Sequence, residues 1–440
     1  MKTFNKTLIA VSVALASTQT LASGFQLNSQ SATGMGRAFA GDAVIADNAS
    51  VLSRNPAAMA LFDKDAISFG LTYADITVDV KDVNFAGGAV DLGSIDDAGS
   101  SKIIPNIFYI HPIDDKFAVG FAAFSNFGTG TDASSLSKSL PANSPAPYDL
   151  LGETEVTTVN FNASLSYRIN DMFSIGAGVD AIYGEGRLTR NMGTTPLVDV
   201  DADGWAFGGI VGATIELDKD NRFGISYRFS PTVNVEGDIN TISTKDLSAV
   251  GLGSKTALAT SFDSLDVPLA DIFQVAGFHQ LTTKFAVHYT AQYTQWGNFD
   301  QITAKDGVAT IIPGQAGAGT QLQAGDVALK EYQWKDSWLF SLGGTYTINE
   351  QFTVRAGYMH DQGVVDEISS ISFPDSDRNW YTAGMSYHIN PQNTVDFGIA
   401  YIKGEKVHLI ENSSITGIGP VNAITESSGM YYSVQYSYQF

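Results

Sequence analysis

Polar and large apolar residues alternate along several stretches of this chain. The stretch "GMYYSVQYSYQF" at 429–440 has Met, Val, Tyr or Phe at every second position, with Ser and Gln between them from Ser433 onward. The same alternation appears in "TTVNFNASLSY" (157–167), "FAVHYTAQYT" (285–294) and "TVDFGIAY" (394–401). A period of two is typical of a strand with one apolar face and one polar face. The pattern predicts an all-β protein.

Fourteen strands are expected from this alternation and from the turn residues between the runs. We place them at 65–80, 103–111, 117–126, 154–168, 172–190, 203–217, 221–238, 267–279, 284–298, 336–348, 352–361, 379–388, 393–404 and 429–440. Most of the tight connections carry Asn or Asp, which favour tight turns. These six connections are "HPIDDKF", "RINDMF", "LDKDNRF", "HQLTTKF", "TINEQF" and "HINPQNT". The other seven connections are long and rich in Gly, Ser, Asp and Pro.

Short and long connections alternate along the chain, which indicates an up-and-down barrel with both termini at the short-turn end. Outer-membrane barrels have an even strand count, short periplasmic turns, long outer loops and aromatic girdles. We therefore predict a 14-stranded antiparallel transmembrane β-barrel. Aromatic residues beside the turns are expected to form one girdle. They are Tyr167, Phe173, Tyr346, Phe352 and Tyr387.

Closure of the barrel would account for the aromatic strand at the end of the sequence. An exposed apolar edge strand of a soluble protein favours aggregation. A strand that closes a barrel has no free edge, and its apolar face can contact lipid. We expect 429–440 to pair with the first strand near Ile67–Tyr73. A soluble β-sandwich is the alternative.

The start of the chain has the features of a secretory signal peptide. Lys2 and Lys6 precede an apolar run at 8–16, and cleavage after Ala22 would leave Ser23 as the first residue. The apolar run is too short for a membrane anchor, because a spanning helix needs ~20 residues. We therefore expect an exported protein with a signal peptide at 1–22.

Composition narrows the possible functions. The formal net charge is −21, and it becomes −23 once the two signal lysines are removed, which argues against nucleic acid as a partner. There is no cysteine, so disulfides and thiol nucleophiles are excluded. After the signal, no stretch is long and apolar enough for a spanning helix. Aromatic residues make up 11% of the chain, which fits a large soluble β protein or a membrane barrel.

Residues 23–64 do not fit the barrel pattern, because they show no period of two. They contain several glycines and one stretch, Ala38–Ala46, that looks helical. A 14-stranded barrel encloses a lumen that its own side chains cannot fill. The segment could therefore be a plug, or hatch, within the lumen of a barrel at 65–440. A periplasmic extension is the alternative.

Three stretches carry a resemblance to a known family. "GFQLN" (24–28), "GRAFAGDAVIADNASVLSRNPAAM" (36–59) and "PDSDRNWYTAGMSY" (374–387) resemble the long-chain fatty-acid transporters of Gram-negative outer membranes, the FadL family. The similarity runs from the signal to Phe440. It implies a fourteen-stranded barrel with an amino-terminal hatch in its lumen, in the outer membrane of a Gram-negative bacterium. It also implies that substrate leaves sideways through the barrel wall.

Asn55-Pro56-Ala57 is the most specific mark of this resemblance. On chemistry alone these residues form a turn before the first strand, because Pro fixes φ and Asn suits turns. The resemblance makes them part of the hatch. Phe25 is likewise only an apolar residue near a terminus, but in the family this region reaches the ligand pocket.

"SNFGTG" (125–130) closes the third predicted strand. Gly and Asn often punctuate strands, so ordinary loop entry is the simplest interpretation. In the family the third strand bends inward and leaves a side opening. Asn126, Phe127 and Gly128 match that place, so the resemblance implies a lateral opening there.

Arg190 shares the lumen-facing parity of its strand. A lumenal Arg can be a selectivity charge or half of an ion pair. The family holds the carboxylate of the acid with basic residues, and Arg190 and Lys330 align with that pair. Lys335 is the rival to Lys330, since it lies nearer the tenth strand and has inward parity. An Arg fork suits a carboxylate well.

Other candidate chemistry is weak. "DVDADG" (199–204) resembles the start of a calcium loop, but the acid that such a loop needs at its twelfth position is replaced by Ile210. The six histidines have no metal-ligand spacing, and no phosphate-binding loop or nucleophile elbow is present. We therefore expect no metal and no cofactor. The third outer loop, about 191–203, is short, and the fourth, within 242–262, could be partly helical.

The expected function is passive uptake of long-chain fatty acids through the plugged barrel into the membrane. Expected partners are a long-chain fatty acid or similar hydrophobic ligand, outer-membrane lipid and lipopolysaccharide, with the protein as a monomer. Uptake of neutral or aromatic hydrocarbons is a rival within transport. A lipid-modifying enzyme, a passive porin and an adhesin are rivals from other classes.

Overall fold

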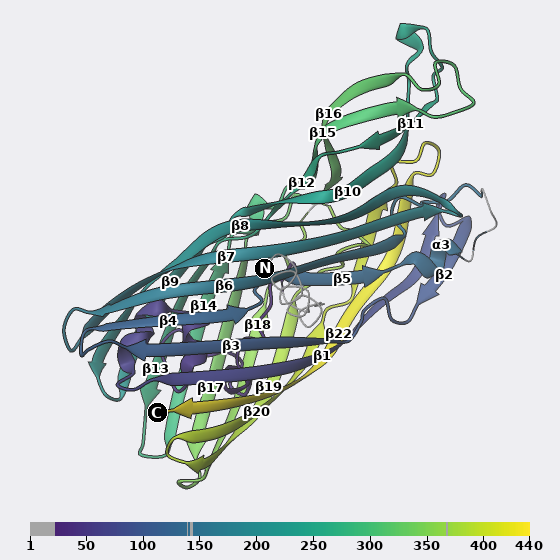
Figure 1. Cartoon of the computed structure of the whole chain (residues 1–440). Coiled ribbons are helices and arrows are strands. Elements are labelled where there is room, and N and C mark those ends of the chain that lie inside the picture. Colours follow the sequence, from purple (N-terminus) through teal and green to yellow (C-terminus); the bar gives the residue numbers. More distant parts are fainter. Residues whose placement is uncertain (1–22, 139, 141–143, 367) are drawn as a thin grey trace.

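We describe a computed structural model of the chain, which covers residues 23–138, 140, 144–366 and 368–440. The predicted signal peptide at 1–22 lies outside the described residues. Fourteen strands form a closed antiparallel barrel, as predicted (Figure 1). In order around the wall they are β1 (Ala66–Phe85), β3 (Lys102–Pro112), β4 (Phe117–Phe124), β6 (Gly152–Arg168), β7 (Phe173–Met192), β8 (Thr195–Asp218), β9 (Asn221–Phe229), β13 (Ile272–Gln280), β14 (Phe285–Thr294), β17 (Ser337–Thr347), β18 (Phe352–Asp361), β19 (Arg378–Asn390), β20 (Asn393–Gly404) and β22 (Pro420–Gln439).

The barrel closes between its last and first strands. β22 runs antiparallel to β1, so that Gln439 faces Ala66 and Tyr432 faces Tyr73. This is the pairing expected for the aromatic carboxyl-terminal strand, and it removes the edge that this strand would otherwise expose.

Asparagine and aspartate fix the tight turns, as the sequence indicated. Asp114 Oδ1 accepts hydrogen bonds from the amides of Lys116 and Phe117, each at 2.8 Å. Asn170, Asn349 and Asn390 cap the β6–β7, β17–β18 and β19–β20 turns in the same way, each through a side-chain oxygen that accepts two backbone amides. These turns and the carboxyl terminus lie at one end of the barrel (Figure 1). Such side-chain caps set the register of the strands that follow.

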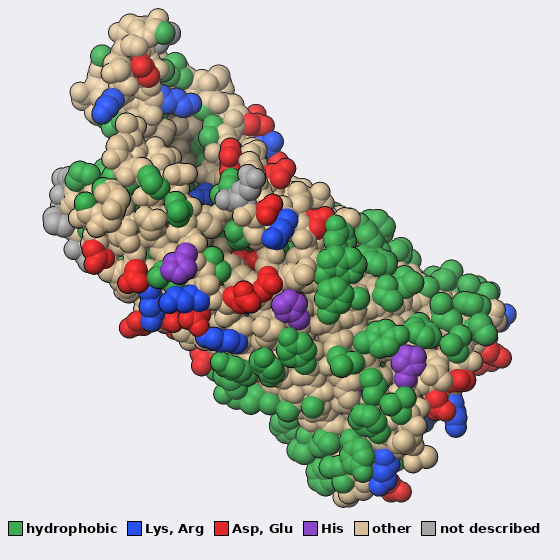
Figure 2. All heavy atoms as spheres, turned by 180° about the vertical axis from the view of Figure 1, so that it is seen from behind, with side chains coloured by type: hydrophobic (Ala, Val, Ile, Leu, Met, Phe, Trp, Pro, Cys, Tyr) green, Lys and Arg blue, Asp and Glu red, His purple; other side chains and the backbone are tan. Residues whose placement is uncertain are grey.

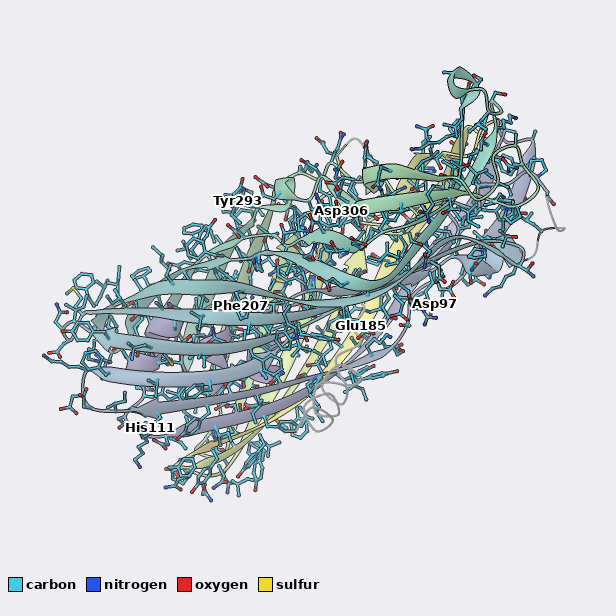
Figure 3. The ribbon with its side chains drawn as sticks, turned by 45° about the horizontal axis from the view of Figure 1, so that its top comes forward. Asp97, His111, Glu185, Phe207, Tyr293 and Asp306 are labelled. Atoms are coloured by element: carbon cyan, nitrogen blue, oxygen red, sulfur yellow. The ribbon has the colours of Figure 1, made fainter. Side chains whose placement is uncertain are left out.

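The outer wall carries a wide apolar band (Figure 2). Phe207 is 76% exposed on the outside of the wall, and Glu185 lies farther from the tight turns than Phe207 does (Figure 3). Aromatic pairs mark the two rims of the band: Phe352–Tyr387 and Phe117–Tyr167 at the turn end, and Tyr358–Tyr381 and Tyr73–Tyr432 at the other. An apolar band between aromatic girdles is the surface that a bilayer requires.

A groove of about 540 Å³ lies on the wall over β19, β20 and β22. Met385, Phe397, Ile399 and Tyr432 line it, and all four side chains are more than one-third exposed. The groove belongs to the lipid-facing side of the wall, so it is separate from the lumen.

The remaining elements lie above the wall or interrupt it. β10 (Thr232–Lys245), β11 (Thr256–Ser261), β15 (Gln301–Ile311) and β16 (Gln321–Glu331) form a sheet that projects beyond the band (Figure 1). The fourth outer loop, within 242–262, has strand near both ends, and its helical part is limited to a single turn of 3-10 helix. The other elements are β2 (Val90–Ile95), β5 (Gly128–Asp132), β12 (Ser264–Pro268), β21 (Val407–Asn412), α3 (Ser134–Lys138), η3 (Ser248–Val250) and η4 (Trp296–Asn298).

Residues 24–61 lie within the barrel, and their short helices lie toward the end that carries the tight turns (Figure 1). They form α2 (Ala32–Met35), η1 (Ala49–Ser53) and η2 (Pro56–Leu61). The helix expected at 38–46 is absent, because Ala38 and Phe39 adopt positive φ values of 54° and 58° and break the helical path. The alternative of a periplasmic extension is therefore wrong, and we call residues 23–64 the hatch segment.

Buried ion pairs stabilise the hatch segment and the wall around it, and a hydrogen bond joins the two. Arg37 pairs with Asp42 at 2.8 Å and with Asp47 at 2.7 Å inside the segment. From the wall, Arg228 pairs with Asp180 and donates to the Ser53 carbonyl at 2.8 Å. Buried charges require such partners, because an unpaired one would be costly.

Candidate functional site

The wall is interrupted in the third strand, between β4 and β5. β4 pairs with β3 only up to Ala123, which faces Ile107, whereas β5 pairs with β6 alone. Ser125, Asn126 and Phe127 form the interruption, and all three side chains are buried. We call these residues the strand-three break. The edge of β3 at 102–106 therefore has no strand partner on this side within the described residues.

The hatch segment satisfies backbone groups that the strand-three break leaves free. The Leu27 amide donates to the Asn126 carbonyl at 2.7 Å, and the Gly128 amide donates to the Phe25 carbonyl at 2.8 Å. Gln30 Nε2 adds a bond to the Ser125 carbonyl at 2.7 Å. The start of the hatch segment is thus bonded directly to the break, so movement of one would change the other.

Phe25 itself is fully buried among aromatic side chains. Five rings lie with centroids 4.7–6.0 Å from its ring. We call this set the aromatic cage, and it consists of Phe127, Trp296, Phe299, Trp334 and Phe373. Gly24 makes the approach possible, because its φ is +61° and a Cβ there would lie 2.8 Å from Trp296.

Arg190 lies inward, as its parity predicted, and is 4% exposed. Its guanidinium donates to the carbonyls of Asp149 (3.2 Å), Glu153 (2.7 Å) and Thr189 (2.8 Å). It also donates to hydroxyls of Thr154 (2.8 Å) and Ser372 (3.0 Å). Every one of these acceptors is neutral. Among the described residues no carboxylate lies within ion-pair distance of Arg190, although Glu411, Asp149 and Asp132 act on its charge from farther away.

Lys330 pairs with Glu411, whose side chain is 2% exposed. Glu411 also accepts a bond from the Ile371 amide at 2.6 Å and one from Ser370 Oγ at 3.2 Å. Lys335, the rival lysine, is 52% exposed and lies 3.9 Å from the exposed Asp366. Lys335 is therefore exposed to solvent and is not part of the buried charged site.

The loop between β18 and β19 (362–377) joins the charged residues to the aromatic cage. Ser372 accepts from Arg190, and its neighbour Phe373 belongs to the cage. Ser370 Oγ connects the two cations, since it lies 3.2 Å from Ser372 Oγ and 3.2 Å from a Glu411 carboxylate oxygen, and its single proton is available to Glu411 when the Ser372 hydroxyl donates to it. Near the end of the loop, burial raises the pKa of Asp375, although Arg378 opposes this shift. The cationic and aromatic parts therefore form one continuous site.

Asn55-Pro56-Ala57 lies away from this site, against the wall. Asn55 Nδ2 donates to the Ala43 carbonyl at 2.9 Å and the Ala213 carbonyl at 3.1 Å, and its Oδ1 caps the Ala57 amide at 3.0 Å. A Cβ at Gly212 would lie 2.0 Å from Asn55 Oδ1. The triplet thus anchors the hatch segment to β7 and β8 and does not contact the aromatic cage.

The calcium-like stretch is not a loop. Asp199, Asp201 and Asp203 lie on the outward face of β8, which runs without interruption from Thr195 to Asp218. Within the described parts of the chain, no group of three or more acidic or histidine residues is arranged to hold a metal ion.

Several residues of the site were not found from the sequence. They are the cage residues Trp296, Phe299, Trp334 and Phe373, together with Glu411. The first three lie where strands are interrupted, at β14–β15 and β16–β17, so they follow no alternating pattern. The sequence signal that could have identified these cage residues is the aromatic content of "WGNF" and "YQW" at the two interruptions.

A family model described as "Outer membrane protein transport protein (OMPP1/FadL/TodX)" matches residues 13–440. This chain belongs to the OMPP1/FadL/TodX family. A long-chain fatty acid transport protein of Escherichia coli O6:H1 is 31% identical over 99% of both chains. Outer membrane protein P1 of Haemophilus influenzae is 30% identical over 99% of this chain and 97% of that protein. The protein is thus an outer-membrane transporter of hydrophobic substrates in a Gram-negative bacterium and not an enzyme.

Solved structures support the fold of this FadL-family protein. A FadL homologue of Pseudomonas aeruginosa has a TM-score of 0.75 and 22% identity, covering 95% of this chain and all of that one. The toluene transporter TodX of Pseudomonas putida has a TM-score of 0.61 and 18% identity, covering 89% and 94% of the two chains. None of the helices in the described residues is long and apolar enough to span a membrane.

Proposed function

We propose that this FadL-family protein takes up long-chain fatty acids by passive diffusion. The acyl chain occupies the aromatic cage after Phe25 leaves it, and Arg190 and Lys330 hold the carboxylate. The acid then leaves sideways into the membrane near Asn126–Gly128.

The observation that carries this proposal is the continuity of charge and apolar surface through Ser372 and Phe373. A carboxylate near Arg190 would place its hydrocarbon chain toward the cage. Each methylene removed from water contributes ~0.8 kcal/mol, so the chain would supply most of the affinity. The charged head group adds specificity for an acid.

The lateral route is supported by the unpaired stretch of β3. The edge at 102–106 and the strand-three break bound a part of the wall that hydrogen bonds between strands do not close. Departure of the Phe25 backbone would free the Gly128 amide, and departure of Leu27 with it would free the Asn126 carbonyl. Release of the hatch segment from the cage would therefore loosen this part of the wall at the same time.

The test compares palmitate with hexadecane, which has the same chain length and no charge. A hydrogen bond to a charged group contributes about 1.5–3 kcal/mol. Arg190→Ala and Lys330→Ala should therefore each weaken palmitate binding roughly 10- to 150-fold and change hexadecane binding little. Lys335→Ala is the matched control and should change neither. Equal losses for both ligands would contradict a carboxylate site.

Uptake of neutral aromatic hydrocarbons is the second candidate. It is favoured by the composition of the cage, in which five rings surround Phe25 within 6.0 Å. Aromatic pairs of this kind contribute ~0.5–1.5 kcal/mol beyond burial. Tighter binding of toluene than of palmitate, with no effect of Arg190→Ala on either, would select this candidate.

A further inference from the structure

Glu411 occupies the position that a ligand carboxylate would need in order to reach Lys330. It lies in β21, a short strand beyond the membrane band, and its side chain is 2% exposed. Three donors converge on its two oxygens: Lys330 Nζ, the Ile371 amide at 2.6 Å and Ser370 Oγ at 3.2 Å. One ammonium, one backbone amide and one hydroxyl are the donors that bind a free carboxylate in proteins.

The two cations of the site therefore differ in availability. Lys330 already has a buried anionic partner, whereas Arg190 is bonded to neutral acceptors alone within the described residues. An incoming acid can approach Arg190 by replacing one neutral hydroxyl, Ser372 Oγ. To bind Lys330 as well, it has to displace the carboxylate of Glu411.

We propose that Glu411 is a resident carboxylate that exchanges with the head group of the ligand, and that it sets the affinity of the site for acids. The inference rests on the proposed function, because it requires a ligand with a carboxylate. In the empty protein Glu411 neutralises Lys330. In the loaded protein the ligand takes this ammonium, and Glu411 turns away or is protonated.

Exchange has a direct consequence for specificity. A neutral hydrocarbon gains nothing at Lys330, so Glu411 remains in place and its presence has no effect on that ligand. An acid has to compete with Glu411, so part of its head-group attraction offsets the loss of an existing ion pair. Removing the charge of Glu411 should therefore strengthen acid binding alone.

The test uses Glu411→Gln in the full-length detergent-purified protein. The amide is similar in shape, but it has a single acceptor oxygen, so it can accept from the Ile371 amide or from Lys330 and not from both, since these donors use different oxygens of Glu411. We expect the affinity for palmitate to rise about 10-fold or more, because a charge-assisted contact is no longer opposed. The affinity for hexadecane should stay within about twofold of the wild-type value.

Two further variants serve as controls. Glu426→Gln removes the same charge from the exposed Lys403–Glu426 pair, and it should leave palmitate binding unchanged. Glu411→Asp retains the charge, so it should not reproduce the gain. A heat-dependent shift in gel migration confirms that each variant is folded.

The possible outcomes distinguish failure of the Glu411 inference from failure of the proposed function. If Glu411→Gln binds palmitate no more tightly than wild type while Arg190→Ala binds it less tightly, the resident-carboxylate inference is wrong and the fatty-acid function stands. If Glu411→Gln strengthens hexadecane and palmitate equally, Glu411 only shapes the pocket, and the inference also fails. If no variant binds palmitate, both proposals fall together.

Discussion

Phe25→Ala tests whether the aromatic cage is held closed by the protein's own side chain. Phe25 has no solvent exposure, and its ring contacts five others. Truncation of a buried Phe to Ala costs ~3–5 kcal/mol, which includes the cavity that remains. At 1.4 kcal/mol per tenfold, this energy corresponds to roughly two to three and a half powers of ten. This is the upper limit of the advantage that the substitution can give to a competing ligand.

The measured gain should be smaller than this limit. In the variant, the hatch segment still bonds to the strand-three break through the Leu27 amide, and Gln30 still bonds to the Ser125 carbonyl. We therefore expect hexadecane to bind at least about 10-fold more tightly to Phe25→Ala than to wild type. A change in the fluorescence of Trp296 and Trp334 reports binding, since both residues belong to the cage and a ligand there changes their environment.

Phe39→Ala is the matched control. Phe39 is 2% exposed in the same hatch segment, but its ring contacts Trp380 instead of the aromatic cage. Its truncation should destabilise the hatch segment by a similar amount without opening the cage. If Phe39→Ala strengthens hexadecane binding as much as Phe25→Ala does, general loosening explains the gain. If Phe25→Ala gives no gain, the ligand does not compete with Phe25 and the reasoning is wrong.

Three other predictions follow from the wall and the hatch segment. Lys102 Nζ lies 3.0 Å from Glu155 Oε1, and the two residues are on the strands that flank β5. Cysteines at these positions, joined by a short thiol-reactive cross-linker that reduction cleaves, should block oleate uptake and spare binding. Equal uptake before and after reduction would exclude this exit. Gly212→Ala places a Cβ against Asn55, so it should loosen the hatch segment and raise ion conductance in planar bilayers, whereas Gly186→Ala, with open space around it, should not. Unchanged conductance in both variants would contradict the role of Asn55 in anchoring the hatch segment. The closed barrel should migrate differently on a gel before and after boiling, and identical migration would argue against a closed, detergent-resistant wall.

The barrel could be predicted from the sequence because the bilayer imposes a rule on each wall strand. Every second side chain of a spanning strand faces lipid, so residues such as Leu165 and Phe397 recur with a period of two. Beyond the membrane this rule no longer applies. β16 has no buried side chain, and it lies with β15 in a stretch that the sequence analysis assigns to a long connection. The start of β10 lies within the strand predicted at 221–238, but the sequence does not show that this strand breaks after Phe229 and continues as β10.

The candidate site was predictable only where it lies on a wall strand. Arg190 continues the parity of β7, so its inward direction followed from the strand. Glu411 and Phe373 come from outer segments whose path no periodicity fixes. Their contacts with Lys330 and Phe25 arise from tertiary packing between distant parts of the chain, and so does the burial that gives each residue its chemistry.

The arrangement of the amino-terminal residues links these separate parts of the protein. Ser23 Oγ donates to the Gln362 carbonyl at 2.6 Å, Phe25 fills the aromatic cage, and Leu27 bonds to the strand-three break. Five consecutive residues therefore contact the β18–β19 loop, the pocket and the wall. A ligand that displaces Phe25 has to strain the bonds on both sides of it, because the backbone between Ser23 and Leu27 is short and already buried. Binding in the pocket and loosening of the wall can thus be two results of one local movement, with no separate signal needed between them.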